Sequence, residues 1–458
     1  MNTSLEQERP NALVSWFAIA LVVLGFAFAT GRTAPLLVPD SQSYLEYPFD
    51  SFDGMLRSTR TPGYPAFLGL VRVVFGMAAV PLVQMFVHIT ASWVFMRELH
   101  HWQVRRSSQW AAALAIAVGC TAVDNEAIIS TDLLAASLGV LAAASLLASV
   151  RRDFASLPAI GTVLFSIVAI AVRPAYLSLV PWVTIAGAML CLFQSRMTKG
   201  GFPLRSILIC CAMSGLIAMP IVGWAAVRGV MVHDFGILPF GHQGLAGITT
   251  QLVTEEELRV VAIESADLAE EILASKQRYF DDGFRFSDGA ASATMTIESR
   301  WEDCVWRIIV PAADALYPDD PIASHQAIKM LNREIIFAYP LRYVRWVVLA
   351  ARRACWGTAA NIVMHPIFLP LLVLAVILKL LQLLKQGTAP DTQVSTSLLA
   401  GVDAIFIVAV TYFVVQVGLV ILTSPPLGRF ADAAAIFIPA WIAAWLAPGF
   451  RPGFRLAK

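Results

Sequence analysis

The polar stretch 38–65 lies between two apolar segments and carries residues that suit chemistry at a membrane surface. Asp40 follows the first apolar segment, and Arg60 precedes the second. A carboxylate can accept a proton from an attacking group, and a guanidinium can bind a phosphate through two parallel hydrogen bonds. Their positions just outside two successive membrane helices predict a site at the membrane surface, which the rest of the chain holds in place.

The composition is that of a polytopic membrane protein. Of the 458 residues, 58% are hydrophobic and only 14% are charged, and the mean hydropathy is +0.69. In soluble domains, about a quarter of all residues are charged. The net charge of +1 argues against nucleic acid as a partner, because nucleic-acid-binding domains are usually strongly basic. The six cysteines form no CxxC pair, and the histidines lack metal-ligand spacing.

Ten apolar stretches have about the length of a membrane-spanning helix. They are 12–30, 77–96, 108–123, 132–150, 157–173, 175–193, 206–226, 363–384, 398–422 and 430–447. The first is expected to be a retained helix, because no cationic region of a signal peptide precedes it. Residues 62–76 predict a short helix lying at the interface before the second span.

Basic residues set the expected orientation of these helices. With the N-terminus inside, every short inside loop carries at least one Lys or Arg, whereas the short outside segments 124–131 and 423–428 carry none. The positive-inside rule favours this orientation. We therefore expect the N-terminus inside and the site on the outer face of the membrane.

The segment 227–362 interrupts the apolar pattern after the seventh span and is expected outside the membrane. It holds more than half of the acidic residues of the chain. Thr254 and Glu257 have the spacing of a capping box, which predicts a helix to about residue 280. Further helices are expected over 323–338 and 341–356, and the second of these has the pattern of an amphipathic interfacial helix.

The predicted fold is therefore all-α, with about ten membrane helices and a mainly helical periplasmic domain. Its three parts are an N-terminal bundle over 1–226, the periplasmic domain over 227–362 and C-terminal membrane helices over 363–458.

This topology places seven ionisable residues from separate segments at or near the outer face. They are Asp40, Arg60, Asp124, Glu126, Asp132, Arg173 and Arg429. Ionisable groups at membrane depth are costly, so they tend to face a cavity and to function there. Their common face is the main indication of a site.

Five of these residues also have a structural explanation. Asp40 suits a helix cap or a solvated loop carboxylate, and Asp132 suits a helix cap. The capping-box spacing of Ser43 and Glu46 predicts a helix start nearby. The arginines suit anchors at the membrane interface, to which long cationic side chains extend. These are Arg60, Arg173 and Arg429.

Three short elements, in this order, resemble the C-type glycosyltransferases of membranes. They are VPDSQSYL after the first span, TRTPGYPAFLG before the second, and IISTDLLAASLG at the start of the fourth. The superfamily includes protein O-mannosyltransferases and lipid A aminoarabinose transferases. Its Asp-x-x-x-Tyr element is matched by Asp40 and Tyr44, and its basic element by Arg60. Thr59 departs from the acidic residue that often precedes the basic one, so a divalent cation as cofactor stays open.

The resemblance implies transfer of a sugar from a polyprenyl-phosphate donor to an unknown lipid, glycan or protein acceptor, with inversion at the sugar. Such a reaction needs a base for the acceptor and a cation for the departing phosphate. Asp40 is the expected base, Asp132 is expected to orient the acceptor, and Arg60 is expected to bind the phosphate. The other residues expected to contact substrate are Tyr44, Tyr64, Arg173 and Arg429.

Two other functions fit parts of the pattern. A polymerase or ligase of lipid-linked glycans would differ mainly in its donor. A transporter or flippase would use charges and broken helices near the middle of the membrane, for which Arg173-Pro174 is a candidate. The lack of an inverted repeat and the placement of the charges at one face favour the enzyme.

Cys304 and Cys355 both fall in the outer segment. An oxidising periplasm lets disulfides persist. Nothing in the sequence fixes the distance between the two residues, so a bridge and two free thiols both stay open.

Overall fold

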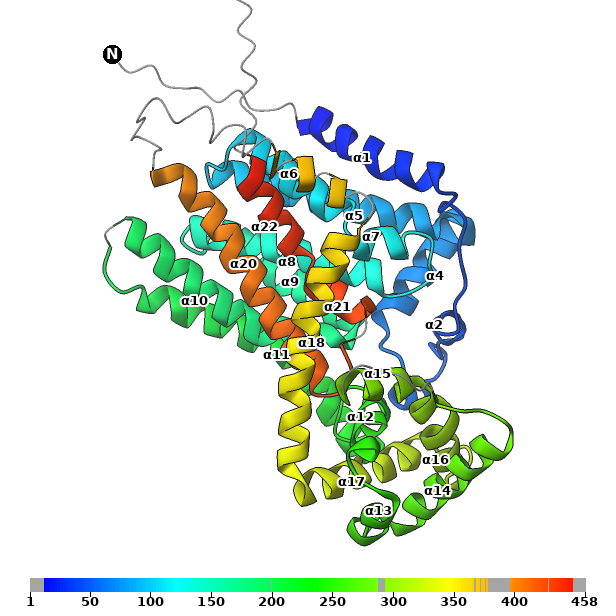
Figure 1. Ribbon diagram of the computed structural model, residues 1–458. Coiled ribbons are helices and arrows are strands. Elements are labelled where there is room, and N and C mark those ends of the chain that lie inside the picture. Colours follow the sequence, from blue (N-terminus) through cyan, green and yellow to red (C-terminus); the bar gives the residue numbers. More distant parts are fainter. Residues whose placement is uncertain are drawn as a thin grey trace, which may run out of the picture.

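The computed structural model describes residues 12–198, 200–286, 293–365, 368–370, 372–374, 376–377, 396–426 and 428–447. Within these residues the regular secondary structure is helical, and one isolated bridge pairs Leu36 with Ile128. The all-α class expected from the sequence is confirmed. The helices form an apolar bundle with a smaller group of helices at one end (Figure 1).

The chain contributes three groups of helices. The N-terminal bundle contains α1 (Ala12–Ala29), α2 (Ser41–Leu45), α3 (Phe52–Arg57), α4 (Gly63–Phe75), η1 (Met77–Ala79), α5 (Val80–His101), α6 (Arg106–Ala117), α7 (Cys120–Asn125), α8 (Asp132–Arg151), α9 (Ser156–Val172), η2 (Pro174–Ser178), α10 (Leu179–Met197) and α11 (Leu204–Met231). Residues 232–339, which we call the insert domain, contain α12 (His242–Thr249), η3 (Thr250–Leu252), α13 (Glu255–Val261), α14 (Ala266–Asp281), α15 (Ala293–Asp303), the π-helix η4 (Cys304–Ile309), α16 (Val310–Leu316) and α17 (Pro321–Ala338). The C-terminal group contains α18 (Pro340–Met364), α20 (Thr396–Ile421), α21 (Gly428–Ala434) and α22 (Phe437–Leu446).

Six helical segments in the described part of the chain are long and apolar enough to cross a membrane. A seventh is added if α18 and the segment Phe368–Leu374, which meet at a bend of 82°, form one span. This supports a multi-pass membrane protein but gives fewer long spans than the ten expected. The expected span 108–123 divides into α6 and α7, and 430–447 divides into α21 and α22.

Two other expected spans also differ. The stretch 157–173 forms α9, which has 17 residues and is at the short end of the range for a membrane helix. Half of the expected span 363–384 lies outside the described residues. The short helix expected over 62–76 is present as α4.

Helix α8 is the central helix of the bundle. It is buried over most of its length, and it packs between α5, α9 and α10. Its sequence is rich in Ala, Ser and Gly, which let neighbouring helix backbones approach closely. Gly139 has no room for a side chain, since a Cβ there would meet Tyr412 Oη and would lie 3.0 Å from Tyr176 Cε1.

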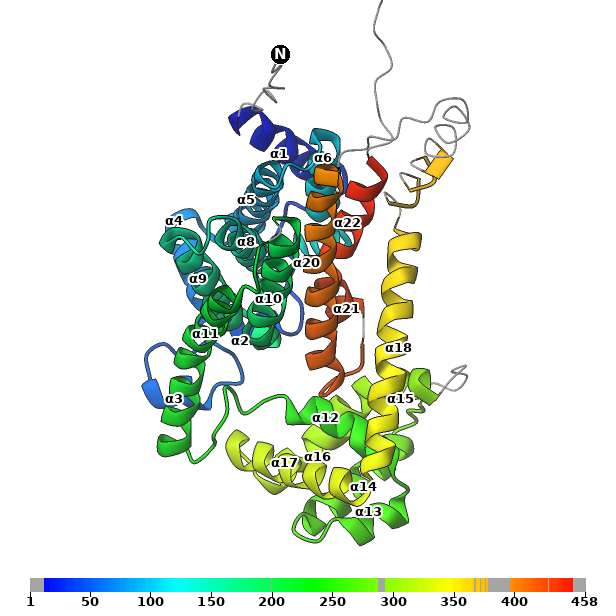
Figure 2. The same ribbon diagram turned by 90° about the vertical axis from the view of Figure 1, so that its left-hand side faces the viewer.

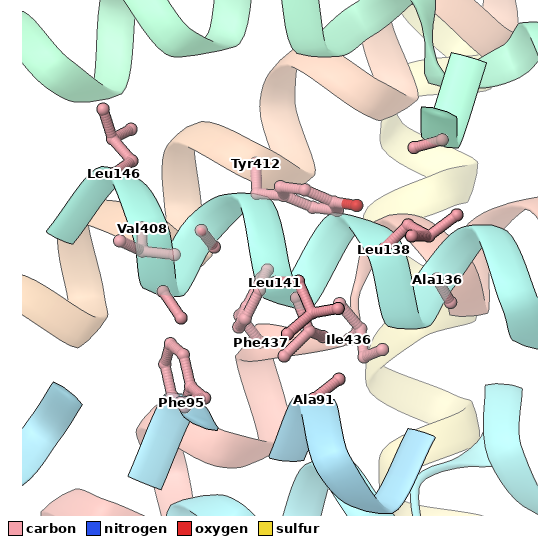
Figure 3. Packing of buried hydrophobic residues seen from close by; sticks show 14 of the residues in the cluster. Ala91, Phe95, Ala136, Leu138, Leu141, Leu146, Val408, Tyr412, Ile436 and Phe437 are labelled. Atoms are coloured by element: carbon pink, nitrogen blue, oxygen red, sulfur yellow. The ribbon is translucent and has the colours of Figure 1, made fainter. Parts of the chain in front are cut away.

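Aromatic side chains from the C-terminal helices complete this core. Tyr412 of α20 and Phe437 of α22 meet edge to face, with ring centroids 5.0 Å apart. Phe437 also lies 5.4 Å from the ring of Phe95 on α5 (Figure 3). The first and last parts of the chain are therefore joined in one apolar core around α8.

The insert domain has its own apolar core, to which α12, α13, α14, η4, α16 and α17 contribute. The capping box of Thr254 and Glu257 is present, so the predicted helix start is confirmed. The helix expected to reach residue 280 is divided into α13 and α14. Glu334 of α17 accepts hydrogen bonds from the backbone amides of Ile263 and Glu264 at the break, and these bonds replace the helical pairing there.

The remaining helices of the insert region lie close to their expected places. The helix expected over 323–338 is α17. The amphipathic helix expected over 341–356 is α18, which continues to Met364 and runs alongside α20 (Figure 2). Cys304 is buried and Cys355 is exposed, and both are free thiols.

A buried arginine joins the bundle, the first polar loop and the insert domain. Arg228, near the end of α11, is fully buried and donates to the backbone carbonyl of Leu56 on α3. Its Nη2 also lies 2.6 Å from Asp234 Oδ2, and that oxygen lies 3.5 Å from Nδ1 of His325 on α17. Removing either charge of a buried pair is costly, because it leaves the other charge uncompensated. Arg228 is therefore held in place by Asp234, and its hydrogen bond to Leu56 fixes the loop that carries Arg60.

Candidate functional site

Asp40 begins the short helix α2 in the loop that follows α1. Its side chain makes no capping hydrogen bond to α2, so the cap explanation for this residue is wrong. The capping box expected for Ser43 and Glu46 is also absent from the described loop. Ser43 Oγ instead donates to the backbone carbonyl of Asp40 at 2.7 Å, one turn earlier. The Asp40 carboxylate is thereby left to interact across the loop.

Arg60 collects the polar groups of this loop. Its Nη2 lies 2.8 Å from Asp40 Oδ1, and its Nε donates to Ser43 Oγ at 2.7 Å. Its Nη1 donates to the Tyr44 hydroxyl at 3.3 Å, and its guanidinium carbon lies 4.7 Å from the centre of the Tyr44 ring. The guanidinium is held in a fixed orientation, with 19% of the side chain exposed.

A second ion pair forms where α8 and α9 meet. Asp132, the first residue of α8, accepts a hydrogen bond from Nη1 of Arg173, which follows the last turn of α9. The same Nη1 lies 3.4 Å from Thr131 Oγ1. Both charged side chains are about nine-tenths buried. Asp132 is therefore a buried counter-ion in addition to starting its helix.

These two ion pairs border one hollow region between the bundle and the insert domain. A cavity of about 890 Å³ is lined by Asp40, Arg60 and Asp132. A smaller cavity of about 330 Å³ is lined by the same three residues and also by Arg173. The structure thus brings together three residues that the topology argument placed at one face, two from the first loop and one from the start of α8.

The larger cavity has an excess of carboxylates. Its acidic lining residues are Asp40, Asp124, Asp132, Glu302, Asp314 and Asp432, and its basic lining residue is Arg60. Several of these carboxylates have local partners. Asp432 accepts from Asn361 at 2.7 Å, and Asp314 accepts from Ser324 at 3.2 Å. Among the described lining residues, Arg60 is therefore the one cation that faces this acidic region.

The insert domain closes the cavities with aromatic side chains. Phe240 and Trp306 stack with ring centroids 6.0 Å apart, and both line the two cavities. Arg60 also lies 5.8 Å from the centre of the Phe240 ring. Trp306 belongs to the π-helix η4, and π-helices are often found at functional sites. The aromatic wall therefore faces the polar groups of the first loop.

Sequence reasoning did not identify this aromatic wall. Glu302, Trp306, Val310 and Asp314 follow one another at intervals of four residues along α15, η4 and α16, and all four line the larger cavity. That spacing places them on one helix face, which is a signal the sequence does contain. Phe240 lies in an irregular segment and has no such periodicity.

The two tyrosines of the first loop differ in position. Tyr44 lines the smaller cavity, and burial raises the pKa of its hydroxyl, so it stays a neutral hydrogen-bonding group. Tyr64 is fully buried behind it, lines neither cavity and donates to Gln84 Oε1 at 3.0 Å. The two rings meet edge to face at 5.0 Å. Tyr64 therefore positions Tyr44, and its expected contact with substrate is corrected.

The remaining residues of the expected outer face, Asp124, Glu126 and Arg429, differ in their positions. Asp124 lines the larger cavity. Glu126 is 1% exposed, and neither carboxylate oxygen has a hydrogen-bond partner in the described part of the chain. Burial raises the pKa of this carboxyl to about 7. Arg429 falls in α21, but its side chain lies outside the described residues.

The described residues contain no group of three or more His, Cys, Asp or Glu side chains arranged to hold a metal ion. A divalent cation therefore stays an untested cofactor.

Comparisons with known proteins give no further guidance on this arrangement. The chain matches no protein-family model, no curated protein and no solved structure.

Proposed function

We propose that this protein is an integral-membrane glycosyltransferase, which moves a sugar from a polyprenyl-phosphate donor to an acceptor. The observation that carries the proposal is the meeting of Asp40, Arg60 and Asp132 around one cavity at the end of an apolar helix bundle. Such a cavity offers a proton acceptor and a phosphate ligand within reach of the lipid phase. The order of the three sequence elements that resemble C-type glycosyltransferases supports the same assignment.

Arg60 is the donor-phosphate ligand in this proposal. A guanidinium has five N–H donors, and three of them are used by Asp40, Ser43 and Tyr44. When Asp40 leaves Arg60, the N–H group that it occupied and the two unused ones are available to the oxygens of a phosphate, which guanidinium binds bidentately. The contacts to Ser43 and Tyr44 keep the planar group oriented while the phosphate exchanges with the carboxylate of Asp40.

Asp40 is the base. When the donor phosphate takes the place of Asp40 on Arg60, the freed carboxylate can accept the proton of the acceptor hydroxyl or amine. The acceptor atom then bonds to the anomeric carbon of the sugar, and the bond from that carbon to the phosphate oxygen breaks. Its electron pair stays on the phosphate, whose charge Arg60 stabilises. Attack opposite the phosphate inverts the anomeric centre.

The other side chains of the cavity position the reactants. Asp132 is fixed by Arg173 and is close enough to the cavity to accept a hydrogen bond from a sugar or acceptor hydroxyl. The stacked rings of Phe240 and Trp306 offer an apolar face on which the C–H groups of a sugar ring can pack. The excess of carboxylates disfavours a polyanionic acceptor in the larger cavity.

The site would act at the periplasmic face of a bacterial inner membrane. The distribution of Lys and Arg among the short loops supports that orientation. In this arrangement the insert domain is periplasmic and covers the cavity from the water side.

The proposal is tested by following the fate of the donor. Full-length protein in vesicles is given a panel of polyprenyl phosphates that carry different monosaccharides, together with envelope extract as a source of acceptor. We expect one donor to be converted to free polyprenyl phosphate while its sugar appears in a second product. Arg60→Lys should reduce kcat/KM for the donor by roughly tenfold or more, because a point charge does not replace the planar fork.

Arg57→Lys is the matched control. Arg57 lies in the same loop, pairs with Asp53 at 2.8 Å and lines neither cavity, so this variant should keep wild-type activity. Equal activity of the two variants would overturn the role of Arg60. Use of a lipid-linked oligosaccharide would instead identify a polymerase or ligase, and movement of the intact donor across the bilayer would identify a flippase.

A further inference from the structure

A third cavity, of about 640 Å³, lies on the opposite side of the helix that carries Trp306. Along α15, η4 and α16, Glu302 and Trp306 face the acidic cavity, whereas Arg300, Cys304 and Ile308 face the third one. The two cavities are therefore separated by one helix, and none of the residues lining the third cavity lines the acidic one. Its chemistry can be considered independently of the proposed transfer reaction.

The third cavity combines positive charge with apolar walls. Its basic lining residues are Lys276, Arg300, Arg342 and Arg345, and its acidic lining residue is Glu255. Lys276 lies 2.7 Å from Glu255, and Arg342 pairs with Glu257 outside the lining, so part of the charge is compensated. The lining as a whole has four cations and one carboxylate, in contrast to the acidic cavity on the other side of the helix.

The apolar walls come from the core of the insert domain and from α18. Leu258, Ile272 and Ile308 line one side, and Trp346 and Leu349 line the other. A small inorganic anion would use only the basic groups of such a site. A ligand with an anionic head and an attached apolar chain would use both parts.

Contacts between α18 and α20 place this cavity at the end of a candidate membrane span. Gly401–Ile421 is one of the segments long and apolar enough to cross a membrane. At its end, Trp346 Nε1 donates to the carbonyl of Ile421 at 3.2 Å, and the Tyr343 hydroxyl donates to the carbonyl of Leu422 at 2.7 Å. Trp and Tyr are typical of the interface between the bilayer and water. If Gly401–Ile421 crosses the bilayer, Arg342 and Arg345 lie at the depth of the lipid headgroups.

The surface of α18 beside the cavity is also apolar. Leu341, Val344 and Val348 are 81%, 55% and 63% exposed, and their spacing puts them along one stripe of the helix. An exposed apolar stripe next to arginines is the pattern of a helix that lies against a membrane surface. A lipid beside this stripe has its phosphate at the level of the basic cavity.

We propose that the third cavity binds the phosphate of an anionic membrane lipid, with part of the lipid chain against the apolar wall formed by Trp346 and Leu349. Lys276, Arg300, Arg342 and Arg345 together provide the positive charge of the lining. The bound lipid ties the insert domain to the bilayer beside α18. This inference goes beyond the proposed function and does not depend on it.

The test measures lipid binding to the full-length protein in a neutral detergent. Dioctanoyl phosphatidylglycerol, dioctanoyl phosphatidylcholine and inorganic phosphate are titrated separately, and complexes are counted by native mass spectrometry. We expect saturable binding of phosphatidylglycerol, at least tenfold weaker binding of phosphatidylcholine, and no competition by inorganic phosphate at equal concentration. The double variant Arg300→Gln/Arg345→Gln should bind phosphatidylglycerol about tenfold or more weakly, since each cation near an anionic lipid adds to the attraction.

Arg333→Gln is the matched control, because Arg333 is exposed on α17 and does not line the cavity. It should bind phosphatidylglycerol as the wild type does. The single variant Arg345→Gln changes an exposed side chain, so it keeps the test interpretable if the double variant unfolds, and we expect a loss of several-fold. Equal binding by Arg345→Gln and Arg333→Gln would overturn the proposal. Equal binding of phosphatidylcholine would do the same, and tight binding of inorganic phosphate would assign the site to a soluble anion.

Discussion

At the scale of residues, the acidic cavity is bordered by two carboxylates that are each held by an arginine, Asp40 by one from the same loop and Asp132 by one from the end of α9. Asp40 is paired with Arg60 in a partly exposed position, whereas Asp132 is paired with Arg173 in a nearly buried one. An exposed pair is easily exchanged for a ligand, because water and salt already weaken it. A buried pair resists removal of either partner. This difference assigns ligand exchange to the Asp40 pair and a fixed position to Asp132.

Glu126 gives a residue-scale prediction that is independent of substrate. Burial raises the pKa of its carboxyl to about 7 from 4.5, so the folded protein holds this proton more tightly than the unfolded chain. The contribution of this bound proton to the free energy of unfolding is fully present below pH 4.5 and is lost as the pH rises through 7. Glu126→Gln resembles the protonated form and should therefore raise the free energy of unfolding at pH 8, by on the order of 3 kcal/mol.

Thermal unfolding in detergent at pH 5 and pH 8 checks this expectation. The gain in Tm from Glu126→Gln should be much larger at pH 8 than at pH 5. Glu46→Gln, at an exposed position in the first loop, should show no such difference. A pH-independent effect of Glu126→Gln would contradict the raised pKa.

The sequence predicted one common face for these residues from span counting and loop charge. Although the described residues contain fewer long spans than expected, Asp40, Arg60 and Asp132 do line one cavity. Their pairing could not be predicted. Whether Asp40 meets Arg60 or Arg173 depends on how α2, α4 and α9 pack, and hydropathy carries no information on that packing. The same reason explains why Tyr64 was expected at the substrate and is found behind Tyr44.

At the scale of elements, the packing of α8 in the bundle determines the position of Asp132, the first residue of this helix. Close packing along α8 requires a glycine opposite Tyr412 and Tyr176. A methyl group at that place would press on the rings of two buried tyrosines, which have little freedom to move. The packing of α20 against α8 is therefore specific to this position.

Gly139→Ala should destabilise the protein by about 1–3 kcal/mol, the usual cost of overpacking. Gly215→Ala is the matched control. A Cβ at Gly215 of α11 would meet nothing within 4 Å, so alanine should be neutral or slightly stabilising there. Tm in detergent distinguishes the two variants, and a Gly139→Ala protein as stable as Gly215→Ala would contradict the packing of α8 against α20.

Most helices could be predicted from apolar length and capping signals, but their breaks could not. Thr254 and Glu257 form the expected capping box because both partners are local in the sequence. The division between α13 and α14 depends on Glu334, about 70 residues away, which caps the break. A distant carboxylate of this kind leaves no pattern near residues 262–265.

At the scale of the whole molecule, the site depends on the position of the insert domain against the bundle. Phe240 and Trp306 reach the cavity from the insert domain, while Asp40 and Arg60 reach it from the first loop. Arg228 fixes this arrangement through Leu56 and Asp234. The sequence indicated a separate polar segment, but the surface by which it docks is formed by scattered residues and could not be foreseen.

The expected orientation makes a prediction for the whole chain. A phosphatase that is active only outside the cytoplasm should be active when it is inserted after Gly283, in a turn of the insert domain. It should be inactive when it is inserted after Gln103, in the turn between α5 and α6. A reporter that is active only in the cytoplasm should give the opposite result. Cytoplasmic signals at Gly283 would overturn the periplasmic assignment of the site.

The most direct measurement of the central claim compares the rate of sugar transfer by Asp40→Asn with that by Asp53→Asn. Both variants remove one carboxylate from the first loop, but only Asp40 lines the cavity. Asp40→Asn should bind the donor and lose about 100-fold or more in kcat, because the base is gone. Asp53→Asn should keep wild-type turnover. Wild-type turnover by a normally folded Asp40→Asn protein would contradict the assignment of Asp40 as the base.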